Sequence, residues 1–278
     1  MLEQVKYRNH LGEEVTFGKG GIFVNENDLR DFAWSYTAKN NRISSFQKGV
    51  VKKTLPVILA CNTEAEGIIK RNQLFEICEK DVLAHQHGKF IIGDYYLKCY
   101  IVGSKKSDYL MNNRVLKLKL SIVTDSPAWV KESVNIFRRL DSVIVDENAG
   151  SNLDFPHDFP FDFASEVTNR DIINDDFVST NFRMTIYGPC TNPEIYVGGH
   201  CYAVNTELLA NEHLIVDSAA KTITLYHTNG DQVNCFNNRS REHYVFEKIP
   251  SGANAVTWEG DFGFDITLLE ERSEPKWT

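Results

Sequence analysis

The sequence predicts a mostly β protein made of two domains, and three observations support this prediction. The chain has 278 residues, more than one domain usually holds. Aromatic residues make up 12% of it, and Val, Ile and Thr recur in short runs that favour strands. A helical pattern longer than two turns appears only in the first half. We therefore expect an amino-terminal β-sheet or barrel domain with one helix over residues 1–135, and a carboxy-terminal β-sandwich of the jelly-roll type over residues 136–278.

The charge of the chain changes sign between these two halves. Residues 1–135 hold 20 Lys and Arg against 15 Asp and Glu, a balance of +5, whereas the remainder holds 10 against 23, a balance of −13. Such a reversal indicates separate modules. Nucleic-acid binding depends on Lys and Arg that neutralise phosphates, so the acidic half is a poor candidate for it. We expect no specific nucleic-acid recognition.

Composition also restricts the environment of the protein. No apolar run approaches the roughly 20 residues that span a bilayer, and the first ten residues lack the features of a signal peptide. We expect a soluble protein, synthesised in a cytosol, without membrane insertion. The cysteines are scattered, without a Cys-x-x-Cys pair, in a chain large enough to need no disulfides. We expect six reduced core residues: Cys61, Cys78, Cys99, Cys190, Cys201 and Cys235.

The helix of the first half has a start signal and an end signal in the sequence. Thr63, followed three residues later by Glu66, forms a capping box. Apolar residues then recur at helical spacing. Gly88 is expected to end the helix. We therefore predict a helix over about residues 63–84 that covers a sheet.

Strands are predicted around this helix. Residues 89–92 and 95–102 meet across Gly93 and Asp94, a pair typical of a hairpin turn. Leu alternates with Lys or Ser over residues 116–121, the pattern of a half-buried strand. A cluster of three lysines is expected to be solvated, in a loop or as protection of a sheet edge: Lys48, Lys52 and Lys53.

The second half contains strand signals at the spacing of a sandwich. Strands over residues 214–216, 222–226 and 233–236 are separated by turns, of which Asn229-Gly230 is a strong hairpin signal. Further strands are predicted over residues 244–246, 255–258 and 262–268.

Residues 154–163 read Asp-Phe-Pro-His-Asp-Phe-Pro-Phe-Asp-Phe, and Pro156 and Pro160 exclude a helix. In an extended chain, alternate side chains share a face. Four phenylalanines therefore lie on one face and need cover from the domain or a partner. They are Phe155, Phe159, Phe161 and Phe163.

The search for chemical sites gives only weak candidates. Asp154, Asp158 and Asp162 share the other face of that strip, but they lack the tight glycine turns of a calcium loop. His85 and His87, near Cys78 and Cys99, match no zinc spacing and are expected at a solvated helix end. No nucleophile motif and no phosphate-binding loop is present. We predict a non-catalytic protein without metal or cofactor.

Three segments, in their order along the chain, resemble the distal tail proteins of siphophages. They are the Phe-Pro strip, the run Pro-Glu-Ile-Tyr-Val at residues 193–197, and the tail from Trp258-Glu259-Gly260 to Trp277. The resemblance spans nearly the whole chain. It implies a ring-forming amino-terminal domain and a galectin-like carboxy-terminal sandwich.

The resemblance also implies a role and partners. A structural virion protein of this family forms a homohexameric hub at the distal end of a long non-contractile tail. It joins the tail tube protein to the tail-associated lysin or fibre protein, and its outer domain docks receptor-binding or baseplate proteins. Sheet edges and aromatic faces find cover at the interfaces of such a ring. We expect Trp34 and Tyr36 there.

Two alternatives remain open for the sandwich. Galectin-like folds bind sugar through polar strand residues and a Trp platform, and this chain has part of that set in Asn237, Arg239, Trp258 and Glu259. The first alternative is therefore a carbohydrate-binding module acting in host adsorption. The second is a glycosidase that uses two carboxylates from among Asp154, Asp158, Asp162 and Glu259.

Overall fold

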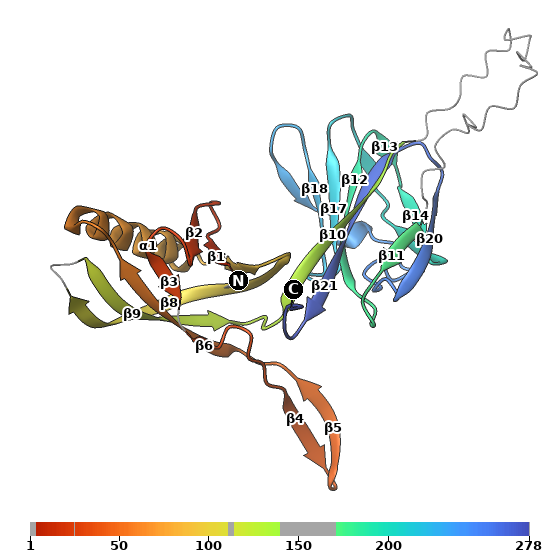
Figure 1. Cartoon of the computed structure of the whole chain (residues 1–278). Helices are drawn as coiled ribbons and strands as arrows, with labels where there is room; N and C mark the ends of the chain where they lie inside the picture. The colour runs from red at the N-terminus through yellow and green to blue at the C-terminus, as the bar shows by residue number, and fades with distance from the viewer. Residues whose placement is uncertain (1–3, 25, 111–113, 140–170, 278) are drawn as a thin grey trace, which may run out of the picture. The chain divides into compact units, whose positions relative to one another are not determined.

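The computed structural model describes residues 4–24, 26–110, 114–139 and 171–277 (Figure 1). Within these residues the protein is mostly β with one α-helix, as predicted: strands hold 54% of the described residues and helices 10%. The chain divides into two compact units, the first comprising Met1–Lys131 and Glu271–Thr278, the second Glu132–Glu270. The chain therefore passes from unit 1 into unit 2 within one strand, Trp129–Phe137, and returns to unit 1 within the last strand of the chain, Gly263–Arg272.

Unit 1 contains two antiparallel sheets that share their longest strand, β8. Their orders are β2-β1-β7-β8-β10 and β8-β9-β6-β3. Residues 95–99 of β8 pair with β7, and residues 100–110 pair with β9. The strands are β1 Val5–Arg8, β2 Glu14–Phe17, β3 Ile22–Val24, β6 Val51–Ala60, β7 Gly88–Ile92, β8 Tyr95–Leu110, β9 Val115–Thr124 and β10 Trp129–Phe137.

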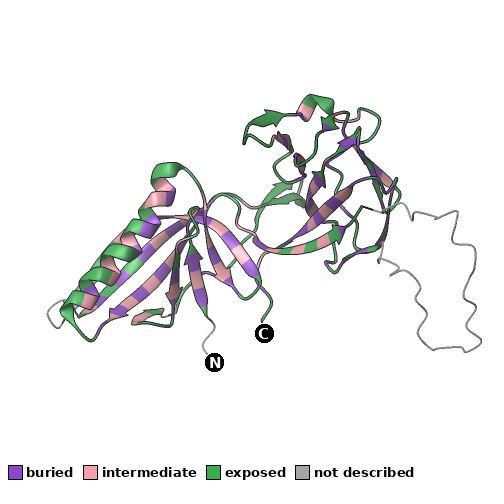
Figure 2. Ribbon diagram, turned by 90° about the horizontal axis from the view of Figure 1, so that it is seen from above, coloured by how far each residue is buried: buried purple, intermediate pink, exposed green. Residues whose placement is uncertain are grey.

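The core of unit 1 follows from alternation along these strands. Leu116, Leu118 and Leu120 of β9 are all buried, which confirms the predicted half-buried strand. Their register partners on β6 are buried aliphatic residues as well. Figure 2 shows the same alternation of buried and exposed positions across the sheets. Burial of each aliphatic side chain contributes roughly 1.5–3 kcal/mol, so this inner face stabilises the unit.

Helix α1 spans Glu64–Ala84 and confirms the predicted helix. The Thr63 side chain accepts a hydrogen bond from the backbone N–H of Glu66, as expected of the N-cap. The predicted end signal is wrong, because the left-handed cap is His85, with φ 52°. Gly88 instead opens β7. A Cβ atom there would lie 2.2 Å from the hydroxyl of Tyr7, so only glycine fits.

A buried carboxylate joins α1 to the first strand. Asp81 is fully buried and accepts a hydrogen bond from the hydroxyl of Tyr7 at 2.5 Å. It also accepts one from the backbone N–H of His10 at 2.9 Å, and the imidazole Nδ1 of His10 lies 2.5 Å from it. Three partners satisfy a charge that would otherwise be costly to bury. No local sequence pattern predicts this network, because its residues are distant along the chain.

Unit 2 is a β-sandwich of two antiparallel sheets. Their orders are β10-β21-β12-β17-β18-β19 and β11-β20-β14-β15, and β13 pairs with β16 beside them. The strands are β11 Asp171–Asn174, β12 Asn181–Tyr187, β13 Cys190–Thr191, β14 Glu194–Val197, β15 His200–Ala203, β16 Glu207–Leu208, β17 His213–Asp217, β18 Thr222–Tyr226, β19 Gln232–Asn234, β20 Gly252–Trp258 and β21 Gly263–Arg272, with a 3-10 turn η1 at Phe236–Asn238.

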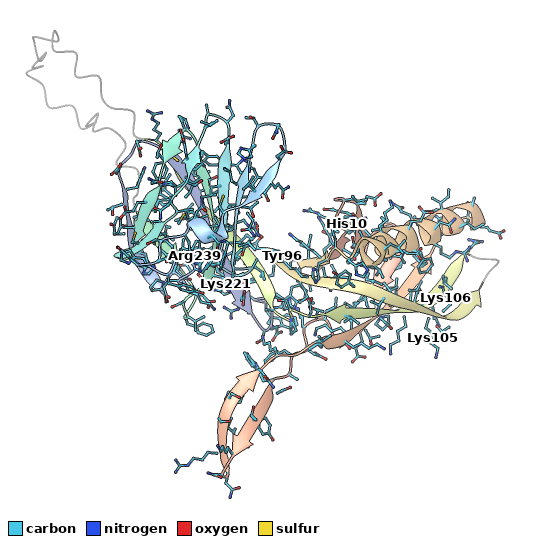
Figure 3. The ribbon with its side chains drawn as sticks, turned by 180° about the vertical axis from the view of Figure 1, so that it is seen from behind. His10, Tyr96, Lys105, Lys106, Lys221 and Arg239 are labelled. Carbon is cyan, nitrogen blue, oxygen red and sulfur yellow. The ribbon has the colours of Figure 1, made fainter. Side chains whose placement is uncertain are left out.

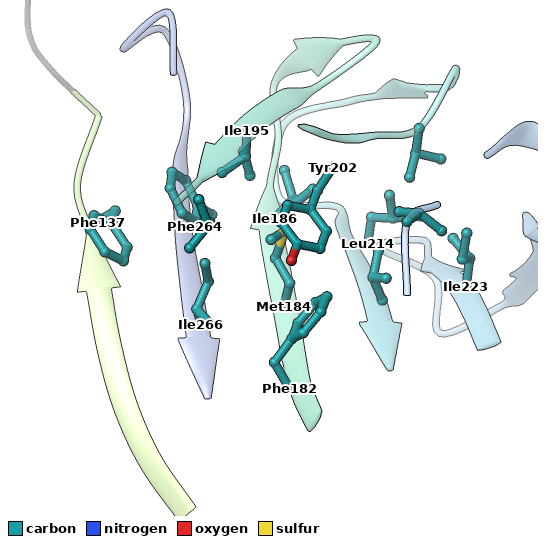
Figure 4. Packing of buried hydrophobic residues seen from close by; sticks show 14 of the residues in the cluster. Phe137, Phe182, Met184, Ile186, Ile195, Tyr202, Leu214, Ile223, Phe264 and Ile266 are labelled. Atoms are coloured by element: carbon teal, nitrogen blue, oxygen red, sulfur yellow. The ribbon is translucent and has the colours of Figure 1, made fainter. Parts of the chain in front are cut away.

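Inward-facing side chains of both sheets form one core in unit 2 (Figure 4). The alternating residues of β21 lie in it, as predicted, with Phe264, Ile266 and Leu268 fully buried. The hairpin predicted at Asn229-Gly230 is confirmed, because β18 pairs with β19 across it. The strand predicted over residues 244–246 is wrong. That segment is a turn in which the Glu247 N–H donates to the carbonyl of Tyr244.

The last residues of the chain, Glu271–Thr278, belong to unit 1, whereas they were predicted in the carboxy-terminal domain. Arg30 holds them there: its Nη1 donates to the carbonyl of Pro275 at 2.8 Å, and its guanidinium lies 3.9 Å from the centre of a Trp277 ring. Local sequence patterns cannot predict contacts between residues about 245 positions apart.

All six cysteines are buried and free, as predicted. Burial raises the pKa of the Cys78 thiol to about 12, so this thiol stays protonated and unreactive. Within the described part of the chain, no helix is long and apolar enough to cross a membrane.

Candidate interaction surface

A separate two-stranded hairpin is the most exposed element of unit 1. Strand β4, Ser35–Lys39, pairs with β5, Arg42–Gln47, and with no other described strand. Asn40 and Asn41 form the turn with φ of 52° and 56°, the left-handed values of a type I′ hairpin turn. Every residue of both strands is exposed, and Figure 1 shows the hairpin projecting from the body of the unit.

This hairpin carries large apolar side chains in water. Tyr36 lies directly opposite Phe46, so the strand geometry gives these two rings a common face. Trp34 comes immediately before β4. The exposed fraction is 65% for Tyr36 and 61% for Phe46. Other exposed apolar residues on or beside the hairpin are Phe32, Ile43 and Val50.

Trp34 and Tyr36 were predicted from the sequence as interface residues. Phe46 and Ile43 were not among the predicted residues, although the structure exposes them beside Tyr36. The pair Asn40-Asn41 is the sequence signal that could have revealed the hairpin, because two consecutive asparagines favour a tight turn between strands. Lys48 supports the face, because its Nζ lies 4.5 Å from the centre of a Trp34 ring. We call this surface, Trp34, Tyr36, Ile43 and Phe46, the hairpin face.

The base of the hairpin is fixed by a buried lysine. Lys53 was expected in solvent but is only 5% exposed. Its Nζ donates to the carbonyl oxygens of Asp28 at 2.9 Å and Asp31 at 2.5 Å. The Asp28 carboxylate accepts from the N–H of Thr54 at 2.6 Å. Burial lowers the pKa of Lys53, while Asp28 and Asp31 oppose that shift, so the segment leading into β4 is anchored by a charged group.

An isolated two-stranded hairpin is at best marginally stable in water, because it has no second layer to cover its apolar face. The hairpin face therefore has the properties of a surface that is covered in an assembly. The hydrogen bonds of Lys53 and Asp28 hold the segment at its base in place before binding, and this lowers the entropic cost of binding.

The residues proposed for sugar contact lie on separate segments of unit 2. The Trp258 indole packs against Phe264 and Phe137, with ring centroids 5.1 and 5.8 Å apart, and its Nε1 donates to the carbonyl of Phe262 at 3.0 Å. Arg239 instead stacks on Phe236, 3.9 Å from the ring centre, beside the exposed Asn237. Trp258 is half-buried in the core cluster, and Glu259 beside it is exposed. Sugar contact by these residues stays a prediction.

Other sequence candidates are separated in space or lie outside the described residues. The strip with Phe155, Phe159, Phe161 and Phe163, and its three aspartates, falls outside them. His85 caps α1, whereas His87 Nε2 lies 3.0 Å from the carboxylate of Asp125. Within the described ranges, no group of three or more His, Cys, Asp or Glu residues is placed to hold a metal ion.

No protein-family model and no curated protein sequence matches this chain. Solved structures do. It is similar to a chain of the phage P2 baseplate in its activated conformation with Ca, with a TM-score of 0.61, 12% identity, and coverage of 99% of this chain and 100% of that one. A second structure, the Dit protein of phage SPP1, gives a TM-score of 0.57 at 9% identity, covering 96% of this chain and 99% of that one.

This chain has the Dit fold. The phage p2 baseplate structure with Sr agrees, with a TM-score of 0.60 at 11% identity over 99% of this chain and 100% of that one. The SPP1 Dit protein is described as a paradigm of the hub adsorption apparatus in phages that infect Gram-positive bacteria. The likeness confirms the fold that the sequence resemblance implied. At this identity it concerns the path of the chain, so the roles of individual residues must come from this chain's own contacts.

Proposed function

We propose that this protein is a structural component of a virion, the hub at the distal end of a long non-contractile phage tail, and that it catalyses no reaction. Six copies form a closed ring that joins the tail tube to the tail-associated lysin or fibre protein, and unit 2 docks baseplate or receptor-binding proteins. The observation that carries the proposal is the uncovered hairpin face on a chain with the Dit fold.

The hairpin face supports assembly into a ring in particular. In a cyclic assembly each copy presents one surface to a different surface of its neighbour, and the contacts close when the rotation is complete. A projecting hairpin with a fixed base suits such a contact, because it reaches beyond its own unit. Trp34, Tyr36 and Phe46 are residues of the type that dominates the energetic centre of protein interfaces.

Size-exclusion chromatography with light scattering tests the proposal on the pure protein. We expect a particle of about six times the 31.7 kDa chain mass. The variant Ile43→Ser/Phe46→Ser should shift it to the monomer. The matched control is Phe177→Ser/Val178→Ser in unit 2, which removes the same kinds of exposed side chain and should leave the particle intact.

A strict monomer at high concentration that binds neither the tube protein nor the fibre protein would refute the hub. A particle that survives the hairpin variant and breaks in the unit 2 variant would instead move the interface to unit 2.

A further inference from the structure

A groove lies between the carboxy-terminal half of α1 and strand β8 in unit 1. It is lined by Phe75 and Val82 of α1 and by Val102 and Ser104 of β8, and its volume is about 260 Å³. An apolar cavity of about 150 Å³ is enough to hold a benzene ring. The groove can therefore accept an aromatic side chain. We call it the α1 groove.

The α1 groove is open because β8 has a strand on only one side here. Residues 95–99 pair with β7, whereas the rest of the described strand pairs with β9 alone. The register shifts between Ile101 and Gly103, and the extra residue of this bulge, Val102, is 52% exposed. The Oγ of Ser104 is buried without a hydrogen-bond partner among the described residues. An exposed apolar side chain beside an unsatisfied oxygen indicates a surface that a partner covers.

The rim of the groove along α1 is acidic. Glu76 and Glu79 lie three residues apart, on the same side of the helix, and both are exposed. Leu83, one turn further, is 75% exposed. In the described part of the chain, neither carboxylate has an ion-pair partner. The nearby cation Lys106, labelled in Figure 3, places its Nζ 4.3 Å from the centre of the Phe75 ring. The rim therefore favours a partner that carries positive charge.

The hairpin of a second copy has the matching properties. Ile43 lies opposite Ala38, which is two positions from Tyr36 and so on the same side of β4. The next pair, Lys39 and Arg42, forms the tip. Neither cation has an ion-pair partner in the described chain, and the hairpin contains no Asp or Glu. An apolar side that ends in two cations is complementary to an apolar groove with an acidic rim.

The hairpin and the α1 groove lie on different sides of unit 1. Figures 1 and 3 show α1 and the hairpin on opposite sides of the sheets of this unit. The hairpin therefore does not reach the groove of its own chain. A heterologous contact joins one surface of a copy to a different surface of its neighbour, and repetition of that contact closes a ring. Two complementary surfaces on opposite sides of one unit meet this requirement.

We propose that the hairpin face of one copy docks into the α1 groove of the next copy. Lys39 and Arg42 at the tip then lie beside Glu76 and Glu79 at the rim, and these charges set the register of the contact. The inference rests on the ring of the proposed function and adds the surface that receives the hairpin.

Charge reversal tests the contact without altering the core. Lys39→Glu/Arg42→Glu reverses the tip, and Glu76→Lys/Glu79→Lys reverses the rim. In each variant the facing charges repel, so the protein concentration at half-assembly should rise at least about 10-fold in light scattering at low salt. The chain with all four substitutions restores opposite charges and should assemble within about 3-fold of the parent concentration. At about 1 M NaCl the differences should shrink, because salt screens exposed charges.

Two steric variants give an independent measurement. Val102→Arg fills the α1 groove, and Ile43→Ser/Phe46→Ser removes the hairpin face, so each protein alone should be a monomer. In a mixture, the hairpin of the Val102 variant still fits the groove of the serine variant. Their other two surfaces are both damaged, so the contact cannot repeat. We expect a 1:1 dimer of about twice the 31.7 kDa chain mass.

The matched control is Glu242→Lys/Glu259→Lys, which changes the net charge by the same amount as the rim variant, at two exposed residues of unit 2. It should assemble as the parent does. Equal weakening by the control would overturn the contact, as would failure of the four substitutions to restore assembly.

The same samples separate this contact from the hub. A ring that both the rim reversal and Val102→Arg leave intact refutes the contact and keeps the hub. A dimer or open chain that responds to the reversals as expected keeps the contact and refutes the closed ring. A parent protein that stays monomeric at high concentration refutes both.

Discussion

The hairpin face and the core of unit 2 consist of the same residue types in opposite environments. Tyr36 and Phe46 are 65% and 61% exposed, whereas Phe182 and Phe264 are fully buried. Both pairs stand on antiparallel strands. The difference is the second layer: the sheet that contains β12 and β21 faces the sheet that contains β14 and β20, while in the described part of unit 1 β4 and β5 form a separate sheet that projects from the body of the unit. Aromatic content alone therefore predicts strands. Whether the aromatic rings stabilise the monomer or an assembly depends on whether a second sheet of the same chain covers them.

The largest expected effect tests the buried side of this comparison. The Phe264 ring stacks on Phe137 with centroids 4.7 Å apart and lies edge-on to Trp258. Phe264→Ala would leave a cavity between the two sheets and should cost unit 2 about 3–5 kcal/mol of unfolding free energy. Urea denaturation of the variant and the parent protein, followed by circular dichroism, measures this loss. A loss below about 1 kcal/mol would contradict the assigned core.

Trp258→Ala is expected to have the next largest effect. The indole is half-buried, so truncation should cost about 2–4 kcal/mol, measured by circular dichroism during urea denaturation. The sugar-binding alternative expects a different result. In that case the variant keeps its stability and loses binding to host cell-wall polysaccharide. Glu259→Gln, one residue away and exposed, is the control that should leave the stability unchanged under both readings.

The buried network of Tyr7 and Asp81 is expected to show an effect on stability smaller than those of the two core variants. Tyr7→Phe leaves the Asp81 carboxylate without one donor and should cost unit 1 about 1–3 kcal/mol at pH 7. Burial, with the hydrogen bond to Asp81, raises the pKa of Tyr7 far above its ordinary value of 10.0. A raised pKa gives stability that is complete below pH 10 and lost as the pH rises further, by about 1.4 kcal/mol per pH unit for one proton.

Urea denaturation between pH 8.5 and 11 checks the sign of this effect. The parent protein should lose stability above pH 10 more steeply than Tyr7→Phe, because the variant has no proton to retain at this position. Parallel curves for the two proteins would show that Tyr7 does not retain its proton in the folded state. Tyr226→Phe, in unit 2, is a control that should leave the unfolding of unit 1 unchanged.

The parts of the fold that sequence could predict are those governed by neighbours along the chain. The capping box at Thr63 located α1, and the alternation of leucines located β9. Asn229-Gly230 located a turn because its left-handed backbone requirement is local. Each of these signals lies within a few residues of the structure that it determines.

Contacts between distant residues escaped prediction. Asp81 and Tyr7 are 74 positions apart, and the carbonyl partners of Lys53 lie 22 and 25 positions before it. Because these partners are not visible in the local sequence, the sequence predicts that Asp81 and Lys53 are exposed to solvent. The predicted strand over residues 244–246 failed for a related reason: a short apolar run fits a strand or a buried turn equally well. The hairpin face was not predicted as one surface, because a strand that is exposed on both sides shows no alternation of apolar and polar residues.

The smallest expected effect completes the comparison. Tyr36→Ser removes a ring that touches water over most of its surface, so the free energy of unfolding of the monomer should change by less than about 0.5 kcal/mol, against about 3–5 for Phe264→Ala. Dilution to the monomer before urea denaturation makes the measurement independent of assembly. A loss of 2 kcal/mol or more would mean that the ring packs within its own chain, and the hairpin would then no longer differ from the core. An unchanged free energy of unfolding would mean that the Tyr36 ring contributes its burial to assembly and not to the folding of the monomer.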